Sequence, residues 1–427
     1  MSRTISQVFE EFQRARSHFV QTLADLTQRP QNIDGLRAAG ALRLLRPLLL
    51  DSVPGIQQTA AVAVGRLAGH SEEAARECVN EEILPHLVAS VAEQNRFYRR
   101  SAAFVMRSIA KHSAELAQAV VDSGALAALS QCLEAFDPQA VVEAEALPKT
   151  LHCLKDPDDL VRYVDNPLPI AKNAATCVRE IVKHTPQLAV FAANAGAIEA
   201  LIHLIQETTG ATRYGYYNLC YLQLCIFLVM TVAGILALGY IGAFTETLAL
   251  AIIVQKGIPP LKNALETETE DHAKAAAAWA VGQLGRHTPD HAMAVAEADI
   301  LRLLLSAFLA SESSDELKAK AKRALKNIIQ MCTHLQALET LLGEAPPSIL
   351  KCIVQQFAKV LPNDPKARRA FVQTGALETL LKIRETEAAS EVLDYIQSVC
   401  NLYPPEVVNY YSPGYSAILI EKIDAQA

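Results

Sequence analysis

The chain has 427 residues and a net charge of −7, and 51% of its residues are apolar although only 6% are aromatic. This composition favours packed helices over a β-sandwich, which is rich in Val, Ile, Thr and aromatic residues. The negative charge argues against a general nucleic-acid binder. Nine scattered cysteines without a C-x-x-C pair are typical of a reducing compartment.

Residues 1–30 predict a helical segment ahead of the rest of the fold. The opening "MSRTISQVFEEFQRARSHFV" mixes acidic and basic residues and has no apolar core. Neither a secretory signal nor a mitochondrial transit peptide is therefore expected. We expect the protein to reside in the cytoplasm.

From residue 31 to residue 345 the sequence repeats with a period of 42 residues. The stretches "AAGALRLLRPLLL", "NEEILPHLVASV" and "DSGALAALSQCL" begin at residues 38, 80 and 122, and later copies follow. Each repeat predicts a short helix ending at Gly or a polar residue, a second apolar helix, and a longer helix with small alanines on one face. Such units fit the armadillo or HEAT period and bury their apolar faces only by stacking. We predict an all-α armadillo-repeat α-solenoid, a right-handed superhelix of three-helix units.

Two irregularities interrupt the first half of the array. Gly124 and the equivalent Glu145 are only 21 residues apart, which indicates a half-repeat deletion at residues 136–146 and a missing long helix near Pro138. The next step is about nine residues too long, and the excess lies at residues 163–171. Because this segment contains two prolines, we expect a bulging loop there.

A third irregularity is an uncharged run from residue 214 to residue 245, which is long enough to cross a bilayer. Its second half has the pattern of an ordinary repeat helix, so only residues 216–232 are surplus. A membrane span would place repeats on both sides of a bilayer, and no Lys/Arg cluster flanks the run. We expect a buried or partner-covered insertion. Another interpretation is that residues 163–171 and 216–232 are gene-model artefacts, such as translated intron.

Motifs of catalysis are absent from the sequence. It contains no Gly-rich phosphate loop, G-x-S-x-G elbow or H-E-x-x-H helix, so we assign no catalytic, cofactor-binding or metal-binding residue and expect no cofactor. His70, His112, His184 and His287 recur at one repeat position. We interpret them as helix-end residues whose ring nitrogen bonds a free carbonyl, because residues one repeat apart cannot share a metal ion.

Two basic runs and an aromatic tail are the candidate protein-docking residues. Charged runs are often solvated helix faces, but on a solenoid they can also attract an acidic partner. The tail belongs to a C-terminal helical region, residues 346–427, and its tyrosines could bury their rings in a neighbour or fold back on the last repeat. The candidates are Arg96, Arg99, Arg100, Arg107 and Lys111; Lys318, Lys320, Lys322, Arg323 and Lys326; and Tyr410, Tyr411 and Tyr415.

Several stretches carry a closer resemblance, among them "RPQNIDGLRAAG", "AAAAWAVGQLGRHTP", "KVLPNDPKARRAFV" and "YYSPGYSAILIEKID". Together they resemble the sperm-associated-antigen armadillo family of the axonemal central apparatus. The resemblance implies a non-enzymatic structural scaffold of cilia and flagella, needed for motility. It also implies central-apparatus proteins as partners, with tubulin or microtubules as further candidates. The chain departs from the family by lacking several central repeats near Asp137.

Two other functions remain open at this stage. A soluble peptide carrier resembling importins or catenins would use an Asn near the end of each long helix to grip a peptide backbone. The matching positions here hold none: Arg66, Ser108, Glu180, Tyr240 and Gln283. A membrane-anchored adaptor would require residues 214–245 to span a bilayer. We therefore expect the scaffold function, with binding to protein rather than to nucleic acid or membrane.

Overall fold

The computed structural model describes residues 2–91, 96–134, 168–209, 221–385, 392–415 and 420. Within these residues the chain is helical, and its contacts divide it into two compact units, residues 1–248 and 249–427. The predicted irregularity at residues 136–146 lies outside the described residues, as do residues 163–167 and 216–220. Residues 168–171, which we expected in a loop, begin a helix with Pro169 in its first turn, a position that tolerates proline because no helical donor is lost there.

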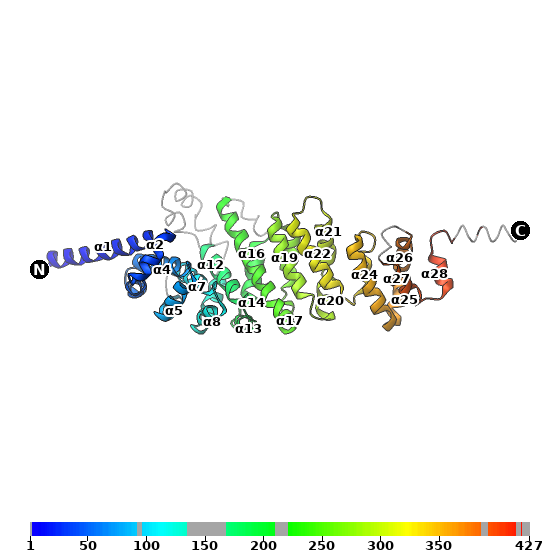
Figure 1. Cartoon of the computed structure of the whole chain (residues 1–427), viewed down its shortest axis with the longest axis horizontal. Coiled ribbons are helices and arrows are strands. Elements are labelled where there is room, and N and C mark those ends of the chain that lie inside the picture. The colour runs from blue at the N-terminus through cyan, green and yellow to red at the C-terminus, as the bar shows by residue number, and fades with distance from the viewer. Residues whose placement is uncertain are drawn as a thin grey trace. The chain divides into compact units, whose positions relative to one another are not determined.

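The first unit is built of short helix pairs, each followed by a long helix. Its long helices α4, α7, α12 and α16 pack side by side in that order (Figure 1). The helices are α1 (Ser2–Leu26), α2 (Pro30–Ala38), α3 (Ala41–Leu45), η1 (Arg46–Leu50), α4 (Pro54–Ala68), α5 (Glu72–Asn80), α6 (Ile83–Val91), α7 (Arg96–Ala110), α8 (Ala114–Asp122), α9 (Ala125–Glu134), α12 (Leu168–Val182), α13 (Pro186–Asn194), α14 (Ala197–Thr208) and α16 (Tyr221–Phe244).

The second unit follows the same plan, and its long helices pack in the order α19, α22, α24 and α27. Its boundary with the first unit falls inside α17 (Glu246–Val254). The remaining helices are α18 (Ile258–Thr267), α19 (Asp271–Leu284), α20 (Pro289–Glu297), α21 (Ile300–Leu309), α22 (Asp315–Ile329), α23 (Leu335–Glu339), α24 (Pro347–Val360), η3 (Leu361–Asn363), α25 (Pro365–Gln373), α26 (Ala376–Arg384), α27 (Leu393–Cys400) and α28 (Pro405–Tyr411).

The repeat residues chosen for turns and caps act locally as their chemistry requires. Gly40, Gly124, Gly196 and Gly375 separate the two short helices of their repeats, and each has a positive φ that glycine adopts without a Cβ clash. The short helices α5, α8 and α13 begin at Ser or Thr side chains that accept a hydrogen bond from a first-turn amide. These signals fix where each helix starts and stops.

Small residues let the long helices approach closely. A Cβ added at Gly65 of α4 would lie 2.4 Å from the Phe104 ring of α7, and one at Gly282 of α19 would lie 2.8 Å from the Ala324 Cβ of α22. Fully buried Val64, Val105 and further Leu, Ile and Val side chains fill the seams. The core therefore runs along the stacked long helices, as expected for repeats that bury their faces against each other.

From residue 221 to residue 244 the uncharged run is one continuous helix, α16, which joins the described part of the surplus segment to the repeat helix. Within it, residues 227–244 are long and apolar enough to span a membrane, but 61% of them are buried in the protein. In the surplus half, Phe227 and Met230 are buried, and the Thr231 hydroxyl lies 2.8 Å from that of Thr208 on α14. The surplus residues from 221 onward thus extend a long repeat helix at its N-terminal end.

Candidate functional site: a basic surface on α7 and α12

The long helix α12 stacks directly on α7, although the two are separated by 57 residues of sequence between Ala110 and Leu168. At the ends of these helices, the His184 Nε2 atom lies 2.9 Å from the Ala110 carbonyl oxygen and the Lys183 Nζ atom lies 3.4 Å from the Lys111 carbonyl oxygen. Nearer the start of α12, the Asn173 amide donates to the Arg100 carbonyl over 3.2 Å. Contacts at both ends therefore fix the register of α12 on α7.

The preceding junction, between α4 and α7, has the same end contacts. The His112 Nε2 atom lies 2.9 Å from the Ala68 carbonyl oxygen, and the Lys111 Nζ atom lies 2.6 Å from the Gly69 carbonyl oxygen. The carbonyls at a helix end lack an intrahelical donor, so a side chain from the next repeat satisfies them. The interpretation of the recurring histidines as helix-end residues is confirmed for His112 and His184, with the detail that each reaches the preceding repeat.

This stacking gathers six cations on neighbouring helix faces. Three basic positions on α7 or directly after it have a basic counterpart 72 residues later on α12 or directly after it, the same offset that relates His112 to His184. The pairs are Arg100 with Lys172, Arg107 with Arg179, and Lys111 with Lys183. We call these six residues the α7–α12 basic surface. All are at least partly exposed to solvent.

The pKa values of Lys172 and Lys111 are lowered, in part by the neighbouring cations of this surface. Burial lowers the pKa of Lys172, and the positive charges of Arg107 and Arg100 lower it further. Burial also lowers the pKa of Lys111, with Arg107 and Lys183 adding to the effect. Like charges disfavour one another at short range. The positive charges of this surface therefore lie close enough together to repel one another.

One carboxylate, that of Glu180, lies within the basic surface and is mostly buried. Its side chain is 10% exposed and contacts both Arg179 and Lys183. Burial alone would raise the pKa of Glu180, but hydrogen bonds from Lys183 and Arg179 outweigh it, so that the pKa falls below its ordinary value. Glu180 therefore stays ionised and positions the two cations at the end of α12. It neutralises one charge of the six.

Three of the six cations of this surface were predicted from the sequence, and three were not. The prediction included Arg100, Arg107 and Lys111 as one run, but not the three cations on α12 or directly after it. A signal was present, because "KHS" at residues 111–113 matches "KHT" at residues 183–185. Of the other residues in the run, Arg99 is half-exposed on α7 and makes none of the contacts above, and the side chain of Arg96 lies outside the described residues.

The second predicted basic run covers the solvent side of α22. The buried residues Leu317, Ala321 and Leu325 hold the opposite side against the core. Lys318 donates to the Ser311 carbonyl over 3.1 Å, and the Lys322 ammonium lies 5.4 Å from the centre of the Phe308 ring. The remaining cations of this run are Lys320, Lys326 and the exposed Arg323. Its five members therefore point in several directions, and we keep this run as a secondary docking candidate.

The tail tyrosines contact one another at the end of α28. The Tyr410 ring centre lies 5.0 Å from that of Tyr411 and 5.7 Å from that of Tyr415, both edge-on, and Tyr410 is 63% exposed. Edge-to-face pairs of this kind stabilise an aromatic cluster. The tail thus presents one exposed ring supported by two others, and a role in docking stays a prediction.

The positions that would hold an asparagine ladder do not line a peptide groove. Arg66 donates to the Ala24 carbonyl over 2.7 Å, and Ser108, Glu180 and Gln283 are 3%, 8% and 5% exposed. Amides that grip an extended peptide must face solvent and offer both a donor and an acceptor. Arg66 and Glu180 instead contact other groups of the protein, and Ser108 and Gln283 are buried.

Comparisons with known proteins place this geometry in a family. No family model matches the chain. It is 42% identical to sperm-associated antigen 6 of Mus musculus over 501 aligned positions, which cover 99% of both chains. It is likewise 42% identical to sperm-associated antigen 6 of Homo sapiens, with 99% of this chain and 98% of the relative covered. Because 501 positions exceed the 427 residues by 74, at least 74 of the aligned positions hold no residue of this chain.

Solved structures of low sequence identity share the fold. A designed armadillo repeat protein superposes with a TM-score of 0.52 at 16% identity, covering 67% of this chain and 99% of that chain. Another, solved in complex with the peptide (KR)4, gives the same values. The predicted all-α armadillo solenoid is thereby confirmed. The chain belongs to the sperm-associated antigen 6 family, with an armadillo-repeat fold.

Proposed function

We propose that this protein is a non-enzymatic structural scaffold of the axonemal central apparatus, where it supports assembly on microtubules and the motility of cilia and flagella. The observation that carries the proposal is the full-length likeness to sperm-associated antigen 6, at 42% identity. A stacked helical array suits this role because each repeat adds surface while contacting only its neighbours. The proposed partners are other central-apparatus proteins, with tubulin as a further candidate.

The α7–α12 basic surface supplies the physical basis for docking. Six cations lie on two adjacent helices or directly at their ends, and Glu180 contacts two of them, Arg179 and Lys183. In a protein of net charge −7, such a local surface steers acidic partners while the rest of the chain repels them. The at least 74 aligned positions without a counterpart are close to two 42-residue repeats. We propose that they are lost near Asp137, so partners that bind those repeats in relatives would not bind here.

The proposal is tested by fractionating flagellated cells that produce the full-length protein. We expect the protein to remain in the axoneme after detergent extraction and to leave it in high salt, since ionic contacts weaken as salt screens them. A protein that is soluble before extraction would instead act as a carrier. One that leaves with detergent would be a membrane-anchored adaptor. Either outcome contradicts the scaffold function.

The contribution of the basic surface is tested in the same cells with a charge-reversal variant, Arg107→Glu/Lys172→Glu. This variant should leave the axoneme at a clearly lower salt concentration than the wild type. Arg302→Glu/Lys382→Glu is the matched control, because it changes the net charge equally at two cations of other helices, α21 and α26. Equal release of both variants would show that net charge, and not this surface, determines retention.

A further inference from the structure

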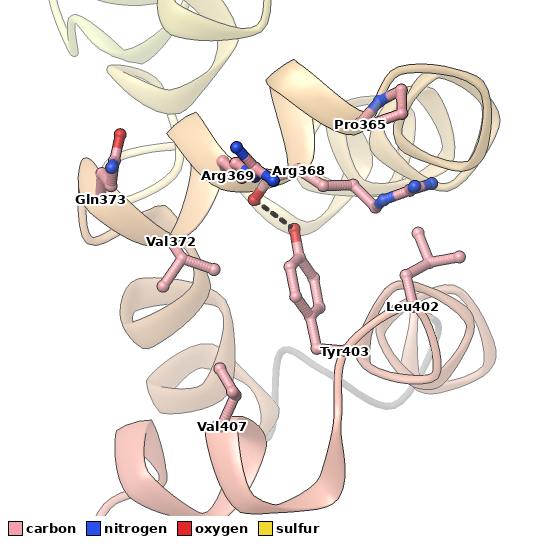
Figure 2. Close-up of a pocket in the computed structure, with 8 residues that line it drawn as sticks. All are labelled: Pro365, Arg368, Arg369, Val372, Gln373, Leu402, Tyr403 and Val407. Atoms are coloured by element: carbon pink, nitrogen blue, oxygen red, sulfur yellow. Dashed lines mark hydrogen bonds between the residues drawn. The ribbon is translucent and has the colours of Figure 1, made fainter.

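A cavity near the C-terminal end of the array has no role in the function proposed above. It has a volume of about 470 Å³ and lies between α25 and the segment that joins α27 to α28 (Figure 2). A space of this size holds a small ligand or one or two peptide side chains. The Asp364 side chain caps the start of helix α25 by accepting hydrogen bonds from the Lys366 and Ala367 amides.

The walls of this cavity combine apolar groups with positive charge. Val372, Leu402 and Val407 provide aliphatic surface around the Tyr403 ring, while Arg368 and Arg369 lie beside one another on α25 (Figure 2). Its eight lining residues include no Asp or Glu. An apolar wall next to two guanidinium groups complements a ligand that joins an apolar body to a carboxylate.

Arg368 is fixed in position before any ligand arrives. Its Nη1 atom donates to the Leu361 carbonyl over 3.1 Å and to the Pro362 carbonyl over 2.8 Å. A guanidinium has five N–H groups, so the Nε and Nη2 donors remain without a hydrogen-bond partner among the described residues. A side chain that is already ordered loses little entropy on binding, which favours affinity.

Tyr403 lines the cavity between Val372 and Leu402 and stays neutral (Figure 2). Its hydroxyl donates to the Arg368 carbonyl over 3.1 Å, and burial raises its pKa to about 12. A protonated phenol adds no negative charge that would oppose an acidic ligand. Arg369, by contrast, is exposed at the rim and has neither an ion pair nor a hydrogen bond within the described part of the chain.

We propose that this cavity binds a short peptide segment of a partner protein in which a large apolar side chain stands next to acidic residues. The apolar side chain enters between Val372, Leu402 and Val407. The neighbouring carboxylate pairs with the outward donors of Arg368 and with Arg369, a geometry that guanidinium groups recognise in two-point fashion. The site is independent of the α7–α12 basic surface, so either proposal can fail without the other.

The test uses the full-length protein and fluorescein-labelled octapeptides with Leu, Phe or Trp followed by two Asp between Gly and Ser spacers. Fluorescence polarisation should show saturable binding of at least one of these probes. Exchange of its Asp residues for Lys, or of its apolar residue for Ser, should weaken binding at least tenfold, which equals about 1.4 kcal/mol. Absence of binding by all three probes, or equal binding of the Lys versions, overturns the proposal.

Variants of the protein then locate the site. Arg369→Glu should weaken binding about tenfold, because it replaces a cation that lines the cavity by an anion that repels the acidic peptide. Lys366→Glu is the matched control: it lies on the same exposed helix, changes the net charge equally and does not line the cavity. Val407→Asp should also weaken binding, while circular dichroism of each variant checks folding. Equal losses for Arg369→Glu and Lys366→Glu would overturn the proposal.

Discussion

The junctions α4–α7 and α7–α12 use the same contacts at their ends but arise from different lengths of chain. In the first, His112 reaches Ala68 across one regular repeat, and in the second, His184 reaches Ala110 over the same 2.9 Å. The two bonded residues are 44 residues apart in the first case and 74 in the second. Stacking of long helices therefore depends on local helix-end chemistry and not on the spacing of repeats along the chain.

The two junctions differ in the side chains that lie midway along their long helices. At the first junction the Phe104 ring occupies the space above Gly65, where a Cβ would lie 2.4 Å from it. At the second junction the matching positions hold Arg107 and Thr176, and Thr176 donates to its own helix at the Lys172 carbonyl over 2.6 Å. The glycine and the phenylalanine of the first junction are thus replaced by one cation and one buried hydroxyl. The long helices still pack directly on one another at both junctions.

The largest expected effect comes from filling the space between Gly65 and the Phe104 ring at the first junction. Gly65→Val should lower the free energy of unfolding by about 3 kcal/mol, because its side chain overlaps the Phe104 ring. Urea denaturation followed by circular dichroism measures the change. Gly35→Ala is the control, since nothing lies within 4 Å of its added Cβ. Equal stability of the two variants would contradict this explanation. Adding Phe104→Ala to Gly65→Val should partly restore the free energy of unfolding, because it removes the overlapping ring.

The next effect concerns the carboxylate of the second junction. Glu180→Ala should lower the free energy of unfolding by about 2 kcal/mol, because Arg179 and Lys183 lose a partly buried partner. The control is Ser108→Ala, the matching position of α7, which carries no charge and should cost clearly less. If the two substitutions are equivalent in urea denaturation, Glu180 does not organise this surface.

The same carboxylate predicts a pH dependence. The pKa of Glu180 lies below its ordinary value of 4.5 in the folded protein, so its stabilising effect is complete above pH 4.5. It is lost as the pH falls through the lower folded value, because protonation removes the charge that Arg179 and Lys183 contact. The stabilities of the wild type and Glu180→Ala should therefore converge below pH 4.5. A constant gap between them down to pH 3 would contradict this assignment.

A smaller effect tests whether the histidine contacts of the two junctions contribute equally to stability. His112→Ala and His184→Ala should each cost about 1 kcal/mol, the usual worth of one hydrogen bond that satisfies a carbonyl. Burial lowers the pKa of His112, so its contribution is present above the unfolded value near pH 6.5 and declines at lower pH. Denaturation at pH 7.5 measures both costs. Losses that differ severalfold would mean that the two junctions are not equivalent.

The smallest effect is expected in the short-helix layer. There Arg76 pairs with Glu72 and with Glu115 of the next repeat, over 2.8 and 3.0 Å, but all three side chains are substantially exposed. Exposed ion pairs contribute little because water screens them. Arg76→Ala should leave the denaturation midpoint almost unchanged. A shift as large as that of Glu180→Ala would remove the distinction between the two layers.

The sequence predicted the repeat fold because its signals are local. Gly124 and Ser113 act through their own backbone neighbours, and His112 bonds the end of the adjacent repeat helix, so a 42-residue match identifies all three. The packing of α7 against α12 was not predicted, because the 42-residue repeat does not relate positions that are 72 residues apart. The α25–α28 cavity was also missed, since Arg368 and Tyr403 meet only after α25 and α27 pack. The contacts among the tail rings of Tyr410, Tyr411 and Tyr415 were not predicted either, because their relative orientation depends on the packing of α28.

The central claim is that α12 stacks directly on α7, and lysine cross-linking of the full-length protein tests it most directly. Lys183 Nζ lies 3.4 Å from the Lys111 backbone, so a short amine-reactive reagent followed by mass spectrometry should join Lys111 to Lys183. Lys318 and Lys322, one turn apart on α22, provide the positive control. A Lys111–Lys183 link alongside the control link supports the stacked array and its basic surface. The control link without the Lys111–Lys183 link would contradict both.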